Sequence, residues 1–413
     1  MSHCHSSDTG RRTFLQASGA AAVAVASLPG PGQAQDAAAA QGAAIPKRRL
    51  GKTGVDVTLL EQGAIRGSSV DRVLRFSYQQ GVRVFDTAKV YGTEPYFKKW
   101  FDQAPEVRKE IFLVTKDMPK TPSQLLTMVD ERLEALGTDY IDLLFIHGLG
   151  DEHSLDDCVN MMKGKELRET ADAIRKSGKA RFIGFSSHHK DRAPIMEAAA
   201  EGGSIDAIML QYRPWLDKDS ALNKAIDSCW KKGIGLISMK QIAGNTFGDK
   251  PQGNILKDVE RKVPMLKERN LTPFQGLLHA IWTDERISTV CVSMRNTDQI
   301  RLNVDAAKRF EPVKEADIRR LRDQAIAFGQ TLCADCDGRC GVAAGTKAEL
   351  GVLTRYLTYH QQLGDRREAR RLYARLSSEA RDWRGADLEA ARAACPNRLD
   401  FATLLPKVDR HLA

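Results

Sequence analysis

The chain has 413 residues, of which 42% are hydrophobic and 28% are charged, so its composition is globular and excludes a disordered or fibrous chain. Its 62 lysines and arginines exceed its 53 acidic residues by 9, an excess too small for this length to predict a nucleic-acid partner. The eight cysteines are too sparse for the disulfide framework of a small secreted domain. A local metal or cluster site is therefore a more specific hypothesis for the cysteines than a disulfide framework.

The N-terminal segment has the features of an export signal. Arg11 and Arg12 precede an apolar run over residues 17–28, which is too short to cross a ~30 Å hydrocarbon core. The pair resembles a twin-arginine signal, with small residues for cleavage at 32–34. We expect residues 1–34 to be a signal peptide for the twin-arginine export machinery, and the Ala/Gln-rich residues 35–45 to be a linker. The mature chain is then periplasmic or otherwise extracytoplasmic, with no membrane span. A disordered basic tail and an uncleaved anchor are the alternatives.

From residue 46 onward, short apolar runs alternate with amphipathic stretches. Strands are predicted at residues 58–62, 82–86, 111–116, 141–147, 180–185, 207–211, 235–239 and 288–292. Helices are predicted at 122–136, 167–177, 220–232, 273–283 and 315–329, and a small hairpin at 47–57. Eight strand–helix units within residues 46–325 predict a closed (β/α)8 TIM barrel with strands buried on both faces. No G-x-G-x-x-G sequence opens a helix, which disfavours a doubly wound dinucleotide-binding sheet.

Polar side chains follow three consecutive predicted strands. Asp86, Lys116 and His147 each end an apolar run, and Tyr91 lies shortly after the first of them. Chemistry in this fold lies at the carboxyl ends of the strands, so we expect these four residues to lie together. The Lys116 ammonium would favour phenolate and lower the pKa of Tyr91, while Asp86 would hold Lys116 charged. His147 could orient a substrate oxygen, which suits the protonation of a carbonyl oxygen while hydride reaches its carbon.

The motif G-x-R-x-x-D-T-A-x-x-Y-G-x-E is present in full over residues 81–94. With the pairs at 115–116 and 146–147, it makes residues 48–303 resemble the aldo/keto reductase superfamily. The resemblance implies that Asp86, Tyr91, Lys116 and His147 form a catalytic tetrad. It also implies a small carbonyl substrate, and NADPH bound across the barrel mouth without a Rossmann motif.

The same resemblance supplies candidates for NADPH binding at the ends of three later strands. These candidates are Ser186, Ser187, Met239, Lys240, Ser293, Met294, Arg295, Gln299 and Asn303. Within this set, Arg295 is the expected partner of a 2′-phosphate. Met239 and Lys240 belong to a segment that resembles the pyrophosphate-side loop of iron–sulfur-type members.

Four cysteines are concentrated near the C-terminus. Cys333, Cys336 and Cys340 follow the spacing C-x2-C-x3-C, and Cys395 stands much later before a proline. Grouped thiolates suit a soft metal or an iron–sulfur cluster, and a cubane needs four. The distant Cys-Pro resembles the last ligand of the ferredoxin-like tails on one branch of the superfamily. We therefore expect residues 326–413 to be a mainly helical extension with one 4Fe–4S cluster. Zinc on the same ligands, and remnant or disulfide-forming cysteines, are the alternatives.

Residues 353–376, between these cysteines, have helical spacing, many arginines and interspersed acids. A solvated helical face is the expected structure, and a docking face for an acidic redox partner is the sharper hypothesis. The whole sequence predicts an exported oxidoreductase for NADPH-linked reduction of an aldehyde or ketone, or the reverse oxidation. The alternative is a partner-dependent electron-transfer protein that uses the barrel as a scaffold.

Overall fold

The computed structural model describes residues 43–150, 153–189, 191–241, 253–328, 332–333, 338–362 and 366–413. The expected signal peptide, most of the linker and Cys336 lie outside the described residues. From Ala44 onward the chain is one compact unit. Among the residues described, no helix combines the length and the apolar character that a membrane crossing requires.

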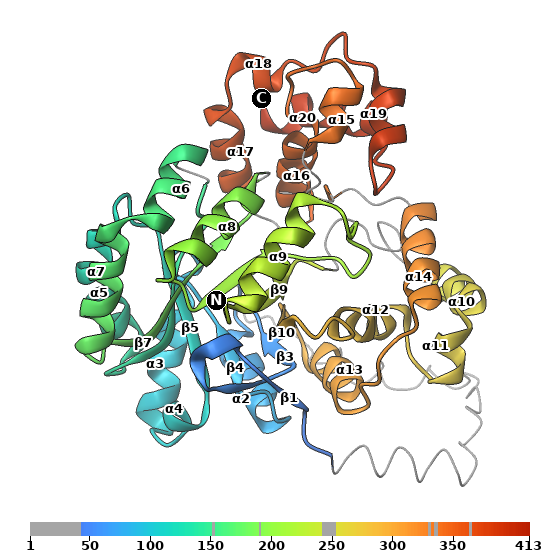
Figure 1. Cartoon of the computed structure of the whole chain (residues 1–413). Coiled ribbons are helices and arrows are strands. Elements are labelled where there is room, and N and C mark those ends of the chain that lie inside the picture. Colours follow the sequence, from blue (N-terminus) through green and yellow to red (C-terminus); the bar gives the residue numbers. More distant parts are fainter. Residues whose placement is uncertain are drawn as a thin grey trace, which may run out of the picture. The chain divides into compact units, whose positions relative to one another are not determined.

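Eight parallel strands close into a barrel, which confirms the predicted (β/α)8 fold (Figure 1). Around the barrel the order is β10-β3-β4-β5-β6-β7-β8-β9, so the chain proceeds from strand to neighbouring strand and the last strand pairs with the first. The strands are β3 (Leu60–Gln62), β4 (Val84–Asp86), β5 (Phe112–Asp117), β6 (Ile141–Ile146), β7 (Ala180–Ser187), β8 (Ala207–Gln211), β9 (Gly235–Met239) and β10 (Ile287–Val292).

The strands read as continuous apolar runs because both of their faces are buried. One set of side chains, with Val84, Val114 and Phe145 among them, packs inside the barrel. The alternate set, with Phe85 and Leu113, packs outward in the larger cluster shared with the helices. This period of two decides which strand-end side chains face the interior.

The predicted hairpin is confirmed as β1 (Lys47–Arg49) paired antiparallel with β2 (Asp56–Thr58), joined through the short 3-10 helix η1 (Gly51–Thr53). Its apolar residues Leu50 and Val57 are buried with the side chains of the barrel interior. Gly51 has a φ of +49°, and an added Cβ would lie 2.2 Å from the carbonyl oxygen of Gly233. Only glycine fits so close an approach, and the hairpin thereby covers the amino end of the barrel.

Helices alternate with the strands, as Figure 1 shows. They are α2 (Val70–Gln79), α3 (Glu94–Gln103), α4 (Val107–Glu110), α5 (Leu125–Leu136), α6 (Leu155–Lys163), α7 (Lys165–Lys176), α8 (Arg192–Gly202), α9 (Ala221–Lys231), α10 (Gly253–Lys262), α11 (Pro264–Glu268), α12 (Pro273–Trp282), α13 (Thr297–Lys308) and α14 (Glu315–Ala327), with the 3-10 turns η2 (Lys89–Tyr91) and η3 (Pro122–Gln124).

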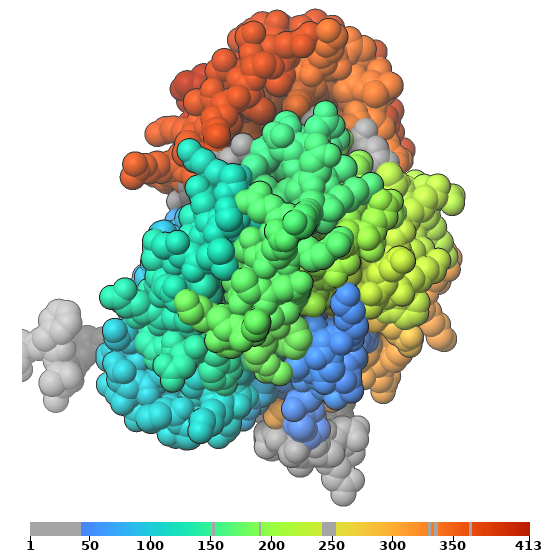
Figure 2. Space-filling view, turned by 60° about the vertical axis from the view of Figure 1, so that its left-hand side comes forward, coloured from blue at the N-terminus to red at the C-terminus, as the bar shows by residue number. Residues whose placement is uncertain are grey.

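We call the described residues 332–333, 338–362 and 366–413 the cap. Its helices are α15 (Arg339–Ala343), α16 (Leu350–Gln361), α17 (Arg366–Arg375), α18 (Ser378–Arg381), α19 (Leu388–Ala394) and α20 (Phe401–Leu412). All of them except α18 contribute to one apolar cluster, which includes Leu353 and Leu357 of α16 and Leu405 and Val408 of α20, and these two helices are in contact. Figure 2 shows the cap, in orange and red, lying directly against the barrel helices drawn in green.

The expectation of a solvated helical face over residues 353–376 is wrong for the first part of the segment and agrees with the exposed arginines of the second part. The segment belongs to two helices, α16 and α17, and α16 is mostly buried between the barrel and the rest of the cap. Tyr359 and His360 are only 6% and 7% exposed. Solvent reaches the arginines of α17 at positions 366, 367, 370 and 375. The spacing correctly predicts helical structure. It does not indicate which other segments of the chain pack against the helix and bury it.

Candidate active site

Strand alternation carries three of the predicted catalytic residues to the barrel interior. Asp86 shares the inward face of β4 with Val84, and Lys116 shares that of β5 with Val114. The register pairs Asp86 with Val114 and Lys116 with Phe145, so neighbouring strands end at matching heights. His147 directly follows β6, two residues after the inward-facing Phe145.

Lys116 and Asp86 form a buried ion pair beneath the barrel mouth. The Lys116 ammonium donates to the Asp86 carboxylate and, over 2.9 Å, to the carbonyl oxygen of Thr87. Burial opposes the ammonium, but the charges of Asp86 and Tyr91 raise the pKa of Lys116 above its ordinary value. Burial likewise raises the pKa of the Asp86 carboxyl, and the charge of Lys116 opposes that rise. Lys116 is therefore a fixed cation.

Tyr91 and His147 face one another above this pair. The Tyr91 hydroxyl lies 3.2 Å from Nε2 of His147, and the rings meet edge to face with centroids 5.3 Å apart. The Lys116 Nζ lies 5.3 Å from the centre of the Tyr91 ring. Burial, followed by the charges of Lys116 and Lys240, holds the pKa of His147 well below its usual range. The structure thus brings the four predicted residues together, with His147 as a neutral imidazole.

Glu61 is a residue of this site that the sequence reasoning missed. Its side chain is fully buried, and neither carboxylate oxygen has a hydrogen-bond partner. Glu61 pairs with Cys291 across β3 and β10, and ligating atoms of Glu61, Asp86 and Cys291 all lie within 4.8 Å of one another. Burial, together with the charge of Asp86, raises the pKa of Glu61 well above its ordinary value, which favours a neutral carboxylic acid. The available signal was a lone acid at an inward position of the run 58–62.

A second network of charged residues lies next to β5, the strand that carries Lys116. Glu94, the last residue of the motif, accepts from Thr115 over 2.7 Å and from Arg132 over 2.9 Å. Arg132 also lies 3.3 Å from Asp117 at the end of β5. Since Thr115 is the strand neighbour of Lys116, this network joins α3 and α5 to the strand that carries the ammonium.

A cavity of about 500 Å³ opens directly above Tyr91 and His147. From the barrel it is lined by Arg66, Val90, Tyr91, Met118, His147, Gly148, His188 and Lys240. From the cap it is lined by Tyr359, Arg366, Arg367, Glu368, Arg371 and Leu372. The cap therefore supplies part of the wall of the candidate active site, and the sequence contained no local signal for this.

Three contacts hold α16 against the barrel beside this cavity. The Arg355 guanidinium donates to the carbonyl oxygen of His188. The Tyr359 ring lies edge to face with His188, at 6.1 Å between centroids, and the Lys240 Nζ lies 4.1 Å from the centre of the same tyrosine ring. Lys240 has a φ of +56°, a left-handed conformation that is uncommon outside glycine and occurs at functional sites.

The predicted cofactor-binding residues lie in two groups. Ser186 and Ser187 end β7, are almost fully buried and bond to neighbouring loops. Ser186 Oγ accepts from the Gly148 N–H, and the Ser187 hydroxyl donates to the Leu149 carbonyl oxygen over 2.8 Å. The hydroxyl oxygens of both serines therefore already take part in hydrogen bonds. The next residue in the sequence, His188, is the one that contacts the cap.

The second group follows β9 and β10. Met239 and Met294 are buried, whereas Ser293, Arg295 and Gln299 are exposed at the start of α13 and Asn303 is half-buried on that helix. The Arg295 N–H donates to the Gln299 side-chain oxygen over 2.8 Å. An exposed arginine before a helix N-terminus is a suitable place for a phosphate.

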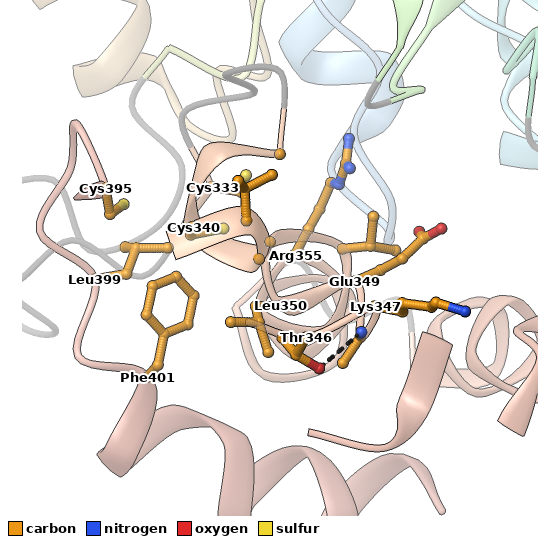
Figure 3. A pocket seen from close by; sticks show the side chains of 16 residues that line it. Cys333, Cys340, Thr346, Lys347, Glu349, Leu350, Arg355, Cys395, Leu399 and Phe401 are labelled. Carbon is orange, nitrogen blue, oxygen red and sulfur yellow. Dashed lines mark hydrogen bonds between the residues drawn. The ribbon is translucent and has the colours of Figure 1, made fainter. Parts of the chain in front are cut away.

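Three of the four predicted metal-ligating cysteines line one cavity of about 230 Å³ (Figure 3). They are Cys333 before α15, Cys340 in α15 and Cys395 after α19, with Leu399 and Phe401 in the same wall. Burial raises the pKa of the Cys340 and Cys395 thiols, and no cysteine within the described ranges forms a disulfide.

A glycine makes room for one of these thiols. A Cβ added at Gly351 would lie 2.7 Å from Sγ of Cys333, so a side chain at this position of α16 would displace the thiol. Three cysteines thus share one cavity beside a position without a side chain, but among the described residues their three Sγ atoms do not all lie within 4.8 Å of one another. The raised pKa values of Cys340 and Cys395 mean that the charge of a bound metal would be needed to favour their thiolates.

The fold and the site define a TIM-barrel enzyme with a buried lysine–carboxylate pair beneath a tyrosine–histidine pair. A family model described as "Aldo/keto reductase family" matches residues 58–325. The chain therefore belongs to the aldo/keto reductase family, and it is an oxidoreductase of that family.

Individual relatives agree with this assignment. L-galactose dehydrogenase of Arabidopsis thaliana is 27% identical over 292 residues, covering 65% of this chain and 89% of the relative. L-glyceraldehyde 3-phosphate reductase of Escherichia coli O157:H7 is 25% identical over 341 residues, covering 68% and 93%. Among solved structures, the holo form of aldo-keto reductase AKR11C1 from Bacillus halodurans has a TM-score of 0.53 at 20% identity, covering 68% and 96%. The last similarity concerns the fold alone.

Proposed function

We propose that this protein reduces an aldehyde or ketone to the alcohol, or catalyses the reverse oxidation, with Tyr91 as the general acid. The observation that carries the proposal is the position of the Tyr91 hydroxyl, 3.2 Å from His147 Nε2 on the floor of the 500 Å³ cavity. A carbonyl oxygen in this cavity can accept from the tyrosine hydroxyl while the neutral imidazole orients it. The carbonyl oxygen gains its proton from Tyr91 as its carbon gains hydride.

The buried groups beneath Tyr91 support this role. Lys116 stays cationic, so its field stabilises negative charge that develops on the tyrosine oxygen as the proton leaves. Asp86 balances Lys116 and fixes its direction through the ion pair. His147 is poorly suited to act as the acid because burial and two ammonium groups favour its neutral form. The proton transfer therefore belongs to Tyr91.

We assign NADPH as the hydride donor, which supplies the two electrons when it is bound. Arg295, with Ser293, Gln299 and Asn303, would hold its adenosine phosphate end at the start of α13, where the side chains are accessible. Met239, Met294 and Lys240 would border its path to the site. The hydroxyls of Ser186 and Ser187 already bond to loops, so the carboxamide end would have to share or replace those bonds. Titration with NADPH and with NADH tests this assignment. Arg295→Gln should weaken the binding of NADPH and leave the binding of NADH unchanged.

The Tyr91→Phe variant tests the acid role. We expect turnover to fall by ~10²–10⁴-fold, the range of general acid catalysis, with little change in ligand binding. Tyr96→Phe, on α3, is the matched control and should keep full turnover. Steady-state reduction of a panel of aldehydes, followed at the nicotinamide absorbance, gives the answer. Undiminished turnover of Tyr91→Phe would reject the role of Tyr91.

We further propose that Cys333, Cys336, Cys340 and Cys395 hold one 4Fe–4S cluster, with zinc on the same ligands as the alternative. The shared cavity of three of these thiols supports the proposal, and Cys336 lies outside the described residues. A cluster would supply single-electron transfer or stabilise the cap. Iron, sulfide and zinc analysis of the natively exported protein distinguishes the two metals, and a metal-free protein with four intact thiols would exclude both.

A partner-dependent electron carrier is the second candidate function. Arg355 favours it, because this residue lines the cysteine cavity and also bonds the barrel at His188. The cysteine cavity and the carbonyl site are thus joined through one side chain. This alternative predicts an undiminished electron-transfer function in Tyr91→Phe and no NADPH binding.

We also propose export through the twin-arginine route to the periplasm, on the basis of Arg11, Arg12 and the apolar run that follows them. Residues 1–50 fused to a folded reporter should direct it out of the cytoplasm. Replacing both arginines by lysine should retain the reporter, whereas a lysine at Arg48 should not.

A further inference from the structure

The cavity above Tyr91 has an unbalanced set of charges. Five cationic side chains line it, contributed by both the barrel and the cap: Arg66, Lys240, Arg366, Arg367 and Arg371. Glu368 is the single acid among its described lining residues, and it pairs with Arg371 over 2.8 Å. A concentration of positive charge in a concave site attracts anionic ligands and raises their local concentration.

Four of these five cations are not among the residues to which the dinucleotide is assigned. The cavity is walled by residues that follow β3, β4, β5 and β6, namely Arg66, Val90, Met118 and Gly148. Of the candidates for dinucleotide binding, Lys240 alone belongs to the described lining. Arg366, Arg367 and Arg371 of α17 therefore line the space above Tyr91, and Arg371 is also bonded to Glu368 through Nε and Nη2.

Helix α17 is held so that its arginines face the cavity. Ala369, Leu372 and Tyr373 anchor it in the apolar cluster of the cap. Arg367 and Arg371 are four residues apart, which places them on one side of the helix. Both line the cavity, whereas Arg370 donates through Nε to the carbonyl oxygen of His411 on α20.

We propose that this cavity binds a carbonyl compound that also carries an anionic group, either a carboxylate or a phosphate. The carbonyl lies toward Tyr91 and His147, and the anionic group lies toward Arg367 and Arg371. The planar guanidinium binds both carboxylate and phosphate through paired hydrogen bonds, so one site can serve either anion. This inference rests on the proposed carbonyl reduction and adds the class of its substrate. It also gives the cap a direct part in substrate selection.

The kinetic test uses three aldehydes that share one ring: 4-formylbenzoate, 4-formylphenyl phosphate and the neutral 4-formylbenzyl alcohol. The full chain should prefer the anionic aldehydes. Arg367→Gln and Arg371→Gln should each lower kcat/KM for them by ~10-fold or more, mainly through KM, because a bond to a charged group is lost. The neutral aldehyde should be unaffected, and the two anionic arms distinguish carboxylate from phosphate. Arg370→Gln removes the same charge from the same helix and should leave all three substrates unchanged.

A binding measurement separates this inference from the proposed reaction. The product analogue 4-(hydroxymethyl)benzoate is titrated by calorimetry into wild type and both variants, without nicotinamide. Arginine-dependent binding in a protein that turns over no aldehyde would support the anion site and reject the reductase proposal. Turnover without preference for anions, or equal losses for anionic and neutral aldehydes in the variants, would overturn the anion site. Binding of an acidic protein that does not compete with the analogue would also overturn it, in favour of a docking face.

Discussion

The barrel site and the cysteine cavity of the cap balance their charges in different ways. In the barrel, Lys116 is a cation supplied by the chain itself, and it faces the buried acids Asp86 and Glu61. In the cap, Cys340 and Cys395 line one cavity, and burial raises the pKa of both thiols and so favours their neutral form. The charge of the barrel site is therefore balanced within the polypeptide, whereas the cluster proposed for the cap would have to supply the positive charge that favours thiolates. Removing one side chain should consequently have different effects in the two regions.

The largest expected effect comes from removing the cation of the barrel. Lys116→Met leaves Asp86 buried without a counter-charge, a type of change that destabilises a protein by about 3–5 kcal/mol. Turnover should fall by at least ~10²-fold, because the field that assists Tyr91 is lost. Urea unfolding and steady-state kinetics measure the two effects, with Lys99→Met on the exposed side of α3 as the control. Stability equal to that of the control would mean that the chain does not depend on Lys116 for charge balance.

The corresponding change in the cap is Cys333→Ser. We expect most of the bound iron to be lost and the cap to become sensitive to protease, because the remaining thiols cannot complete a four-sulfur site. Cys158→Ser, at a buried barrel cysteine, should keep the iron. Iron analysis and limited proteolysis measure these outcomes. Equal iron content in the two variants would remove Cys333 from the ligand set.

Acid should weaken the barrel through its buried imidazoles. Burial lowers the pKa of His279 to about 4, and it holds the pKa of His147 and His188 well below the usual range. The unfolded chain therefore takes up protons from about pH 6.5 downward before the folded chain does, so stability falls as the pH is lowered from 6.5 toward 4. Each such histidine contributes up to about 1.4 kcal/mol per pH unit.

The His279→Gln variant isolates one of these contributions. His279 bonds the carbonyl oxygen of Ala306 over 2.9 Å, a bond that a glutamine amide can also donate. Urea unfolding at several pH values between 7.5 and 4.5 should give a shallower acid slope for the variant than for the wild type. Parallel slopes would contradict a neutral buried imidazole at this position.

The smallest expected effect is that of Glu61→Gln. The raised pKa of Glu61 favours the neutral acid in the folded chain, so glutamine replaces it without loss of charge. In the unfolded chain the Glu61 carboxyl ionises above its ordinary pKa, whereas in the folded chain it stays protonated. The free energy of unfolding of the wild type therefore falls as the pH rises, and that of the variant does not fall for this reason. We expect a stability gain that grows with pH and turnover within a few-fold of wild type. A variant less stable than wild type at pH 8 would indicate that the folded state contains an ionised Glu61.

The accuracy of the sequence-based predictions differed between the two regions. Strands β8 and β9 begin and end at the predicted residues, and the four tetrad residues meet in the interior. Glu61 was not predicted as a site residue, because residues 58–62 were assigned as a buried strand from their overall apolar character alone. The burial of Tyr359 and His360 was not predicted, because their helical pattern does not show whether this face of the helix is exposed to solvent or covered by another part of the protein.

The sequence by itself determined the barrel and the grouping of Asp86, Lys116 and His147, because a period of two and a parallel register place successive strand ends side by side. Only the tertiary structure decided that the cap forms one wall of the cavity above Tyr91. That wall depends on the bond from Arg355 to His188, residues separated by 167 positions. No local pattern encodes such a contact, since it joins two regions whose apolar residues form separate clusters.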